Sequence, residues 1–285
     1  MSVLSHIATT IIFPLQSATL PLFHFPLLSA LHGIRVALEF RRSLEQSGTR
    51  REIGWLQGFF AIMVASVGGS TTSAILMGIP PGWLASNTVL PAYAATYFAV
   101  FYLPGVYPVL LRVRPLLDPF LISADGLTRF SAITSFAIDA CHFRPEVAPR
   151  LGGSWIAMLV CGTIAGCGGG LWNDALQLGS AHWGLRTPRG FKTPTWDMAA
   201  AFLTAACYTF YSMPEILRFE TKGAASLEEA KALSAFVMVG ILLGRWALVN
   251  FSRLFAGPSV PIVDAKSGEK AAKQDVKKPE AKKRK

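Results

Sequence analysis

The amino-acid sequence predicts an all-α membrane protein with seven transmembrane helices, arranged as two inverted three-helix repeats and a seventh helix. Composition is the first reason: 52% of the 285 residues are hydrophobic and 15% are charged, whereas soluble domains have about 25% charged residues. Second, seven stretches approach the length of about 20 mostly apolar residues that a bilayer-spanning helix needs. Third, residues of the first three stretches recur in order in the next three, which indicates a duplication.

The seven stretches follow one another along the chain with polar loops between them. They are residues 20–40, 54–77, 88–111, 116–138, 154–178, 196–217 and 232–254. The second, third, fifth and seventh are strongly apolar, whereas the first and fourth contain Arg35 and Arg129. We expect residues 1–19 to form a lumenal N-terminal segment and residues 258–285, which are Lys-rich and lack aromatics, to form a disordered basic tail.

Lysines and arginines are concentrated in the loops on one side of the expected spans. That side keeps its excess even without the tail, so the positive-inside rule places the C-terminus in the cytosol and the N-terminus in the lumen. The last four residues, 282–285, are Lys-Lys-Arg-Lys and resemble a dilysine signal for the endoplasmic reticulum. The tail is expected either to contact anionic lipid headgroups or to stay solvated, and because this charge lies beside a membrane we expect no nucleic-acid partner.

Matching residues occur at constant offsets in the two groups of three spans. The matches in the first pair of spans are Ser29, Ala30 and Arg35 with Ser123, Ala124 and Arg129. Those in the second pair are Trp55, Gly68 and Gly69 with Trp155, Gly168 and Gly169. Those in the third pair are Phe98, Phe101 and Pro104 with Tyr208, Tyr211 and Pro214. Because each copy has an odd number of spans, the second is expected to be inverted, giving repeats over 20–111 and 112–217 with 232–254 as an addition.

Glycines at matching positions are candidate pore and kink residues. They are Gly68 and Gly69 in the first repeat and Gly168, Gly169 and Gly170 in the second. Glycine permits a kink at membrane depth, and the exposed carbonyls are tolerated where they face water or packed protein. Inverted-repeat proteins commonly place an ion or substrate path between their halves. Close packing of two helices through small residues is an equally good explanation.

Polar residues beside these glycines are candidate pore-lining groups. They are Ser70 and Thr71 in the first repeat and Asn173 and Asp174 in the second. Hydroxyls in membrane helices often bond the preceding carbonyl instead, and Asp174 fits an interfacial position equally well.

Two arginines lie at expected membrane depth, where inserting a charge costs at least about 2.5 kcal/mol. Arg35 and Arg129 occupy equivalent repeat positions, so pseudo-symmetry is expected to bring them toward a common centre, where they line a wet cavity or hold a phosphate headgroup. An ion pair between Arg129 and Asp125, four residues earlier on the same helix face, is the competing account. Arg245, near the cytosolic end of the last span, is expected to extend its charge to the interface.

Several segments, in their order along the chain, resemble a known family. The run Gly68–Pro81 (GGSTTSAILMGIPP) and residues 87–104 are similar to spans two and three of the trimeric intracellular cation channels. Residues 152–178 resemble the fifth span of that family, and Phe191–Thr195 (FKTPT) resembles the approach to the sixth. The likeness covers roughly residues 20–255, and its specificity comes from the order of the motifs.

The resemblance implies a potassium-permeable homotrimer of the endoplasmic or sarcoplasmic reticulum, with a pore inside each subunit that supplies counter-ion current during calcium release. It also implies phosphatidylinositol bisphosphate bound near a Lys-Glu-Val-x-Arg motif in the fourth span. This segment is Asp125-Gly-Leu-Thr-Arg129 here, so an acidic residue replaces the lysine and weakens attraction for the headgroup. Arg129 alone is carried over as a lipid-binding or gating residue, and Arg35 is the alternative contact.

Three hypotheses of function follow. The first is a passive cation channel, whose polar groups partly replace the hydration shell of the ion. The second is a small secondary transporter built on the same inverted repeat, and the third is a seven-span receptor, against which the duplication argues. We expect no enzyme and no metal site, because the five histidines have no metal-ligand spacing and no nucleophile motif is present.

Overall fold

The computed structural model describes residues 2–21, 24–213 and 226–255. The expected basic tail, 258–285, and the end of the expected sixth span, 214–217, lie outside them. The chain divides into one compact unit over Met1–Trp246 and a second over Ala247–Lys285. In the second unit, the described residues continue the last helix.

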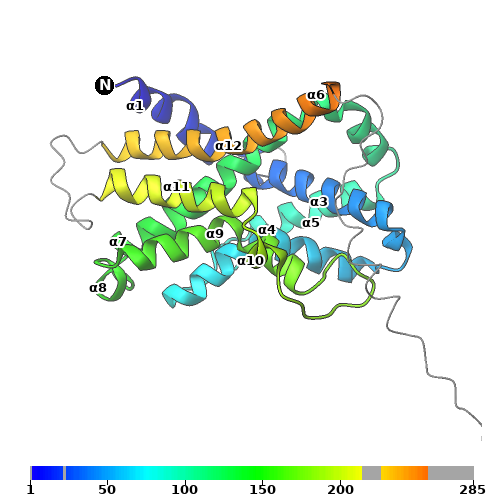
Figure 1. The fold of residues 1–285 in the computed structure, drawn as a ribbon, viewed down its shortest axis with the longest axis horizontal. Coiled ribbons are helices and arrows are strands. Elements are labelled where there is room, and N and C mark those ends of the chain that lie inside the picture. Colours follow the sequence, from blue (N-terminus) through cyan, green and yellow to red (C-terminus); the bar gives the residue numbers. More distant parts are fainter. Residues whose placement is uncertain (1, 22–23, 214–225, 256–285) are drawn as a thin grey trace, which may run out of the picture. The chain divides into compact units, whose positions relative to one another are not determined.

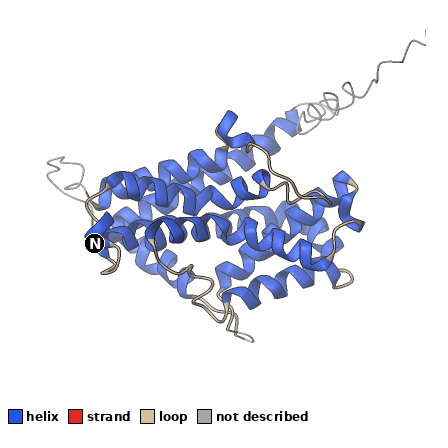
Figure 2. Ribbon diagram, turned by 90° about the horizontal axis from the view of Figure 1, so that it is seen from below, coloured by secondary structure: helices blue, strands red, loops and turns tan. Residues whose placement is uncertain are grey.

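The described residues form helices and no strand (Figure 2), which confirms the all-α prediction. The α-helices are α1 (Val3–Ile7), α2 (Phe13–Ser17), α3 (Leu27–Ser47), α4 (Trp55–Met77), α5 (Val89–Tyr102), α6 (Val106–Ser131), α7 (Asp139–Phe143), α8 (Ala148–Leu151), α9 (Trp155–Ala175), α10 (Arg189–Lys192), α11 (Trp196–Ser212) and α12 (Leu227–Phe255). Two π-helical turns, η1 (Ala8–Ile12) and η3 (Ala132–Ile138), and a 3-10 turn, η2 (Thr49–Arg51), lie between them.

Three of the described helices are long and apolar enough to cross a membrane on their own. They are α4, α9 and the Leu227–Phe251 part of α12. Helix α5 and the continuous helix Val106–Phe143 pass only as a pair, bent by 102°. Helix α3 carries several charges, and α11 has 17 residues, fewer than the ~20 of a full span. By length and composition the protein is therefore a multi-pass membrane protein: among the described residues three helices, or four if the bent pair is one span, are able to cross a membrane. The arrangement of seven spans stays a prediction.

Turn-forming residues place two helix boundaries away from their predicted positions. Helix α3 begins at Leu27, after a proline, later than the predicted start of the span 20–40. The predicted span 88–111 is interrupted, because α5 ends at Tyr102 and Gly105 adopts a left-handed conformation with φ of 82°. The residues that follow belong to α6, which continues through η3 into α7.

Two buried hydrophobic clusters stabilise the unit Met1–Trp246. One contains residues of α3, α5, the first part of α4 and the first part of α6. The other contains residues of the N-terminal helices, the end of α4, η3, α7, α9, α11 and α12. Helix α6 contributes to both, with Leu121 in the first and Ile122 in the second. The centre of α6 therefore lies where the two clusters meet.

Helices α4 and α9 lie against each other near the middle of this unit (Figure 1). A β-carbon at Gly69 would lie 2.5 Å from the carbonyl oxygen of Ile164. A β-carbon at Gly169 would lie 3.2 Å from the carbonyl oxygen of Val64. The same offset in sequence separates Gly69 from Gly169 and Val64 from Ile164, so the contact is reciprocal, as at a two-fold axis.

Candidate functional site

Charged residues line the facing sides of helices α3 and α6. On α3, His32, Arg35 and Glu39 are spaced by three and four residues and share one face. Glu39 contacts Arg114 of α6 at 2.5 Å, and Arg35 contacts Asp125 at 3.1 Å. The residues of α6 that make these contacts follow the opposite order to those of α3, so the two helices run antiparallel and each charge faces one of opposite sign.

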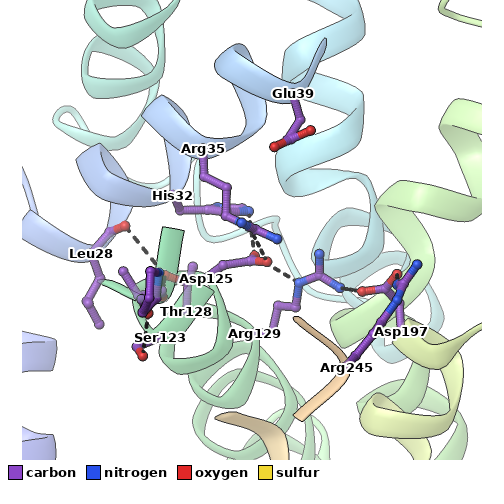
Figure 3. Close-up of polar contacts among 12 residues, drawn as sticks. Leu28, His32, Arg35, Glu39, Ser123, Asp125, Thr128, Arg129, Asp197 and Arg245 are labelled. Carbon is purple, nitrogen blue, oxygen red and sulfur yellow. Dashed lines mark hydrogen bonds and ion pairs between the residues drawn. The ribbon is translucent and has the colours of Figure 1, made fainter. Parts of the chain in front are cut away.

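Asp125 lies at the centre of this polar contact, as Figure 3 shows. Its side chain is only 2% exposed. Oδ2 accepts a hydrogen bond from Nε of Arg35 at 3.1 Å, and Oδ1 accepts one from Nε of Arg129 at 2.9 Å. Nε2 of His32 lies 3.3 Å from the same Oδ1 atom. One buried carboxylate therefore joins three basic side chains from two helices.

The ion pairs continue to two further helices (Figure 3). Nη1 of Arg129 donates to Oδ1 of Asp197 at 2.8 Å, and Nη1 of Arg245 on α12 lies 3.5 Å from Oδ2 of Asp197. Asp197 is in the first turn of α11, where the positive end of the helix dipole favours a carboxylate. Arg35, Asp125, Arg129, Asp197 and Arg245 form a series of alternating charge, which we call the charge ladder.

The ladder joins helices α3, α6, α11 and α12 and has one more positive than negative group. Its members differ in exposure, from 2% for the side chain of Asp125 to 46% for that of Arg245. A buried carboxylate is tolerated only where it is paired and hydrogen-bonded. Relative movement of these four helices therefore requires breaking at least one ion pair.

Helix α5 reaches the ladder through His32 of α3. Nδ1 of His32 lies 2.7 Å from the hydroxyl oxygen of Tyr93 on α5, and the two rings meet edge to face. Because a carboxylate has no proton to donate, the pattern assigns the Nε2 proton to the side that faces Asp125 and leaves Nδ1 to accept from Tyr93. His32 and Tyr93 are 4% and 2% exposed, so these contacts are buried.

Four of the predicted glycines lie together at the α4–α9 crossing. A β-carbon at Gly168 would lie 2.8 Å from the α-carbon of Gly69, and one at Gly68 would lie 3.6 Å from the α-carbon of Gly169. Gly170 points away, with open space where its β-carbon would be. Both helices continue unbroken through the glycines and show no kink-type interruption. The contact itself is the close packing that the alternative interpretation describes.

The predicted polar candidates have different environments. The hydroxyls of Ser70 and Thr71 both donate to the carbonyl of Val67, as expected of hydroxyls in a membrane helix. Oδ1 of Asn173 is buried without a partner among the described residues. Asp174 accepts hydrogen bonds from the side chain of Arg186 and from Arg189, in the segment that follows α9. The side chain of Asp174 is therefore neutralised by its own loop.

Of the predicted site residues, the structure brings Arg35 and Arg129 together at one carboxylate, as the repeat predicts for their position. The intrahelical ion pair of Arg129 with Asp125 is also present, so both accounts of these arginines describe one cluster. The charge of Arg245 has a partner, because its guanidinium group contacts the carboxylate of Asp197. The glycines and polar candidates belong to a separate contact, between α4 and α9.

Three residues of the site are absent from the sequence prediction: His32, Tyr93 and Asp197. The spacing of His32 from Arg35 was a usable signal for a shared polar face. Asp197 follows the N-cap Thr195, where an acidic residue is ordinarily explained by capping. Tyr93 carries no local signal, since only the packing of α5 on α3 brings it near His32.

A second, partly buried ion pair lies elsewhere on α12, with both side chains 17% exposed. Nζ of Lys231 is 3.1 Å from Oδ2 of Asp139 on α7, and the hydroxyl of Tyr208 on α11 donates to Oδ1 of Asp139 at 2.6 Å. Helix α12 is therefore attached by ion pairs at two points, Lys231 and Arg245. In the part of the chain that the structure describes, no three His, Cys, Asp or Glu side chains gather as a metal site.

No protein-family model and no curated protein matches the sequence. Solved structures do match. A TRIC counter-ion channel of calcium release aligns with a TM-score of 0.59 and 19% identity, over 86% of this chain and 99% of its own. The chain has the fold of the TRIC channels.

Two structures of a trimeric intracellular cation channel from C. elegans extend the comparison. The one without Ca²⁺ has a TM-score of 0.61 and 18% identity, covering 86% of this chain and 96% of its own. The one with bound Ca²⁺ has a TM-score of 0.64 and 16% identity, covering 87% and 100%. At such low identity the fold is shared while most side chains differ, which describes a divergent TRIC-like chain. The resemblance seen in the sequence motifs is confirmed at the level of the fold.

Proposed function

We propose that the protein is a monovalent cation channel of an intracellular membrane, permeable to potassium, with a pore inside each subunit that carries counter-ion current during calcium release. The observation that carries this proposal is the fold shared with channel structures over 86% and 87% of this chain. The buried charge ladder adds a physical argument, since charged groups at membrane depth are costly and are retained where ions, protons or substrates are handled.

We propose that the chain is built from inverted repeats, residues 20–111 and 112–217, followed by the helix predicted at 232–254. The reciprocal glycine contact of α4 and α9 supports this. A second reciprocal contact has the same form: Thr49, before α4, donates to the carbonyl of Gly179 after α9, and Arg150, before α9, donates to the carbonyl of Met77 at the end of α4. Inverted repeats place the transport path at their interface.

The proposed ion path follows the α4–α9 crossing, with Gly68, Gly69, Gly168, Gly169 and Gly170 allowing the two helices to separate. Polar atoms at this crossing include the buried Oδ1 of Asn173, which is available to water or a cation. Ser70 and Thr71 stay candidate lining residues, with Asp174 at the end that its loop covers. The charge ladder is proposed as the element whose ion pairs hold the path closed.

Lipid binding is the part of the proposal that Asp125 modifies most. Arg35 and Arg129 each donate Nε to this carboxylate, so an anion is already present where a lipid phosphate would be attracted. We propose that phosphatidylinositol bisphosphate binds weakly here, through the remaining guanidinium nitrogens of Arg35 and Arg129. Replacing Asp125 by lysine is expected to strengthen binding of a bisphosphorylated headgroup, measured on vesicles with and without the phosphoinositide.

The assembly and location follow from the same resemblance. We propose a homotrimer in the endoplasmic or sarcoplasmic reticulum membrane, with the N-terminus lumenal and the C-terminus cytosolic, and with membrane lipid and potassium as its partners. The excess of basic residues on one side of the expected spans supports this orientation. Cross-linking in membranes and protease protection of each terminus test the two statements separately.

A small secondary transporter is the second candidate function. The observation that favours it is the ladder itself, because ion pairs that join four helices can break and re-form between two arrangements, as alternating access requires. A channel current does not saturate at low solute concentration, whereas transport does, and this difference separates the two candidates.

The deciding experiment is single-channel recording in planar bilayers with asymmetric potassium and sodium chloride. We expect cation-selective unitary currents from the purified protein and an altered open probability in Arg129→Ala. The matched control is Arg144→Ala, because Arg144 has an exposed ion pair with Glu146 and belongs to no buried cluster. The absence of unitary currents at all voltages, together with saturable counterflow of a solute into vesicles, would establish the transporter instead.

A further inference from the structure

The buried pair His32 and Tyr93 has no part in the function proposed above, although it touches the ladder directly. The two residues come from α3 and α5, and the carboxylate that they support comes from α6. The hydroxyl oxygen of Tyr93 lies 2.7 Å from Nδ1 of His32, and Nε2 of His32 lies 3.3 Å from Oδ1 of Asp125. Three helices are thereby joined by one line of polar contacts.

A carboxylate needs such support because its terminal torsion is soft. The χ2 angle of an aspartate is broadly distributed, so the plane of the Asp125 carboxylate is free to rotate away from the direction that joins Arg35 and Arg129 unless something fixes it. His32 contacts only Oδ1, the oxygen that also accepts from Arg129. This contact leaves Oδ2 to Arg35 and so fixes the direction in which the carboxylate bridges α3 and α6.

His32 in turn is oriented by Tyr93. An imidazole ring has two nitrogens, and the hydrogen bond at one decides which tautomer is available at the other. With the Tyr93 hydroxyl donating to Nδ1, the proton stays on Nε2 and faces Asp125. The ring of Tyr93 cannot turn away easily, because the side chain is almost fully buried.

A glycine makes this approach possible. A β-carbon at Gly33 would lie 3.1 Å from Cδ1 of Tyr93 and 3.3 Å from Cβ of Thr96. Both distances are shorter than ordinary contacts, so a larger residue at position 33 pushes α5 away from α3. The close packing of the two helices is therefore what places the Tyr93 hydroxyl on His32.

We propose that His32 and Tyr93 are positioning residues of the charge ladder, which hold Asp125 in the orientation that bridges Arg35 and Arg129 and so couple helix α5 to opening. This proposal rests on the function proposed above, because it assumes that the ladder controls opening. It predicts that changes at α5 alter the open-to-closed ratio without altering the current through an open channel.

The test compares three substitutions of one residue in single-channel recordings. In His32→Gln the side-chain amide lies near the position of Nε2 and keeps a donor there. In His32→Asn the shorter amide lies near the position of Nδ1 only, and His32→Leu has no polar group at either position. We expect the asparagine and leucine variants to change the open-to-closed ratio about tenfold and the glutamine variant to stay within about threefold of wild type, all at unchanged unitary conductance. Equal ratios for the glutamine and asparagine variants would overturn the proposal.

A double-mutant cycle gives a readout that does not depend on the channel function. Tyr93→Phe and His32→Leu are combined, and thermal unfolding of the purified protein is measured. We expect the double variant to be no less stable than His32→Leu alone, because the Tyr93 hydroxyl acts through His32. Additive losses would overturn the proposal even if currents are present. If no current is present, the channel hypothesis fails, while non-additivity would still establish the positioning role.

Discussion

Removing the negative charge of Asp125 is the sharpest perturbation that the structure offers. Asp125→Asn keeps the size of the side chain but leaves Arg35 and Arg129 without their buried counter-charge. Loss of one partner from a buried ion pair costs about 3–5 kcal/mol. The low end of this energy range applies to Asp125→Asn, because the side chains of Arg35 and Arg129 are each 25% exposed and are able to turn toward water. At roughly 2–3 °C per kcal/mol for a large domain, we expect the unfolding midpoint to fall by about 6–9 °C.

The assay is thermal unfolding of the purified protein in one detergent, with a surface ion pair as the matched control. Glu146→Gln breaks the pair of Glu146 with Arg144, where the glutamate side chain is 72% exposed, and is expected to cost no more than about 0.5 kcal/mol. Adding Arg35→Met to Asp125→Asn should recover part of the loss, because it removes a charge left unpaired. A midpoint for Asp125→Asn within about 1 °C of the control would refute the account of the ladder as a stabilising buried network.

The remaining predictions concern the other contacts. Gly169→Val should destabilise the protein by several kcal/mol, since a side chain there meets the backbone of α4, whereas Gly170→Ala, which faces open space, should be nearly neutral; thermal unfolding of both variants measures the difference. Lys231→Met should lower the midpoint by leaving Asp139 without its cation, and a midpoint equal to that of wild type would show that the pair contributes nothing. Asp174→Asn should release the loop after α9, detected as faster limited proteolysis near Arg186, and an unchanged cleavage rate would contradict the role of this carboxylate as a loop anchor.

Composition and hydrophobic pattern were sufficient to predict the all-α membrane class and the approximate position of most long helices. This works because apolar length is a local property that the bilayer requires of each helix separately. The helix ends were less well predicted. The break between Tyr102 and Val106 depends on a left-handed glycine at 105, and an apolar average over a window does not detect one residue.

The functional cluster was predicted in part. The sequence placed Arg35 and Arg129 at equivalent positions of the expected repeat, and in the structure both donate to Asp125; their role in lipid binding or gating stays a prediction. Sequence offered no reason to add Tyr93 or Asp197, since the contacts of these two residues depend on how α5 and α11 pack. The glycine contact of α4 with α9 was one of two interpretations, and only the packed helices show that the glycines meet.

By itself, the sequence determined that this chain enters a membrane as helices and that costly charges at membrane depth need partners; the relation between its halves stays a prediction. Tertiary structure alone decided which partners those are. An ion pair between helices is set by distances of about 3 Å, and these depend on helix rotation and on the close approaches that Gly33 and Gly126 permit. Local sequence constrains rotation only through an apolar stripe, and a helix in lipid has no such single stripe. Which residues form the ion pairs around Asp125 is therefore known only once α3, α6, α11 and α12 are packed together.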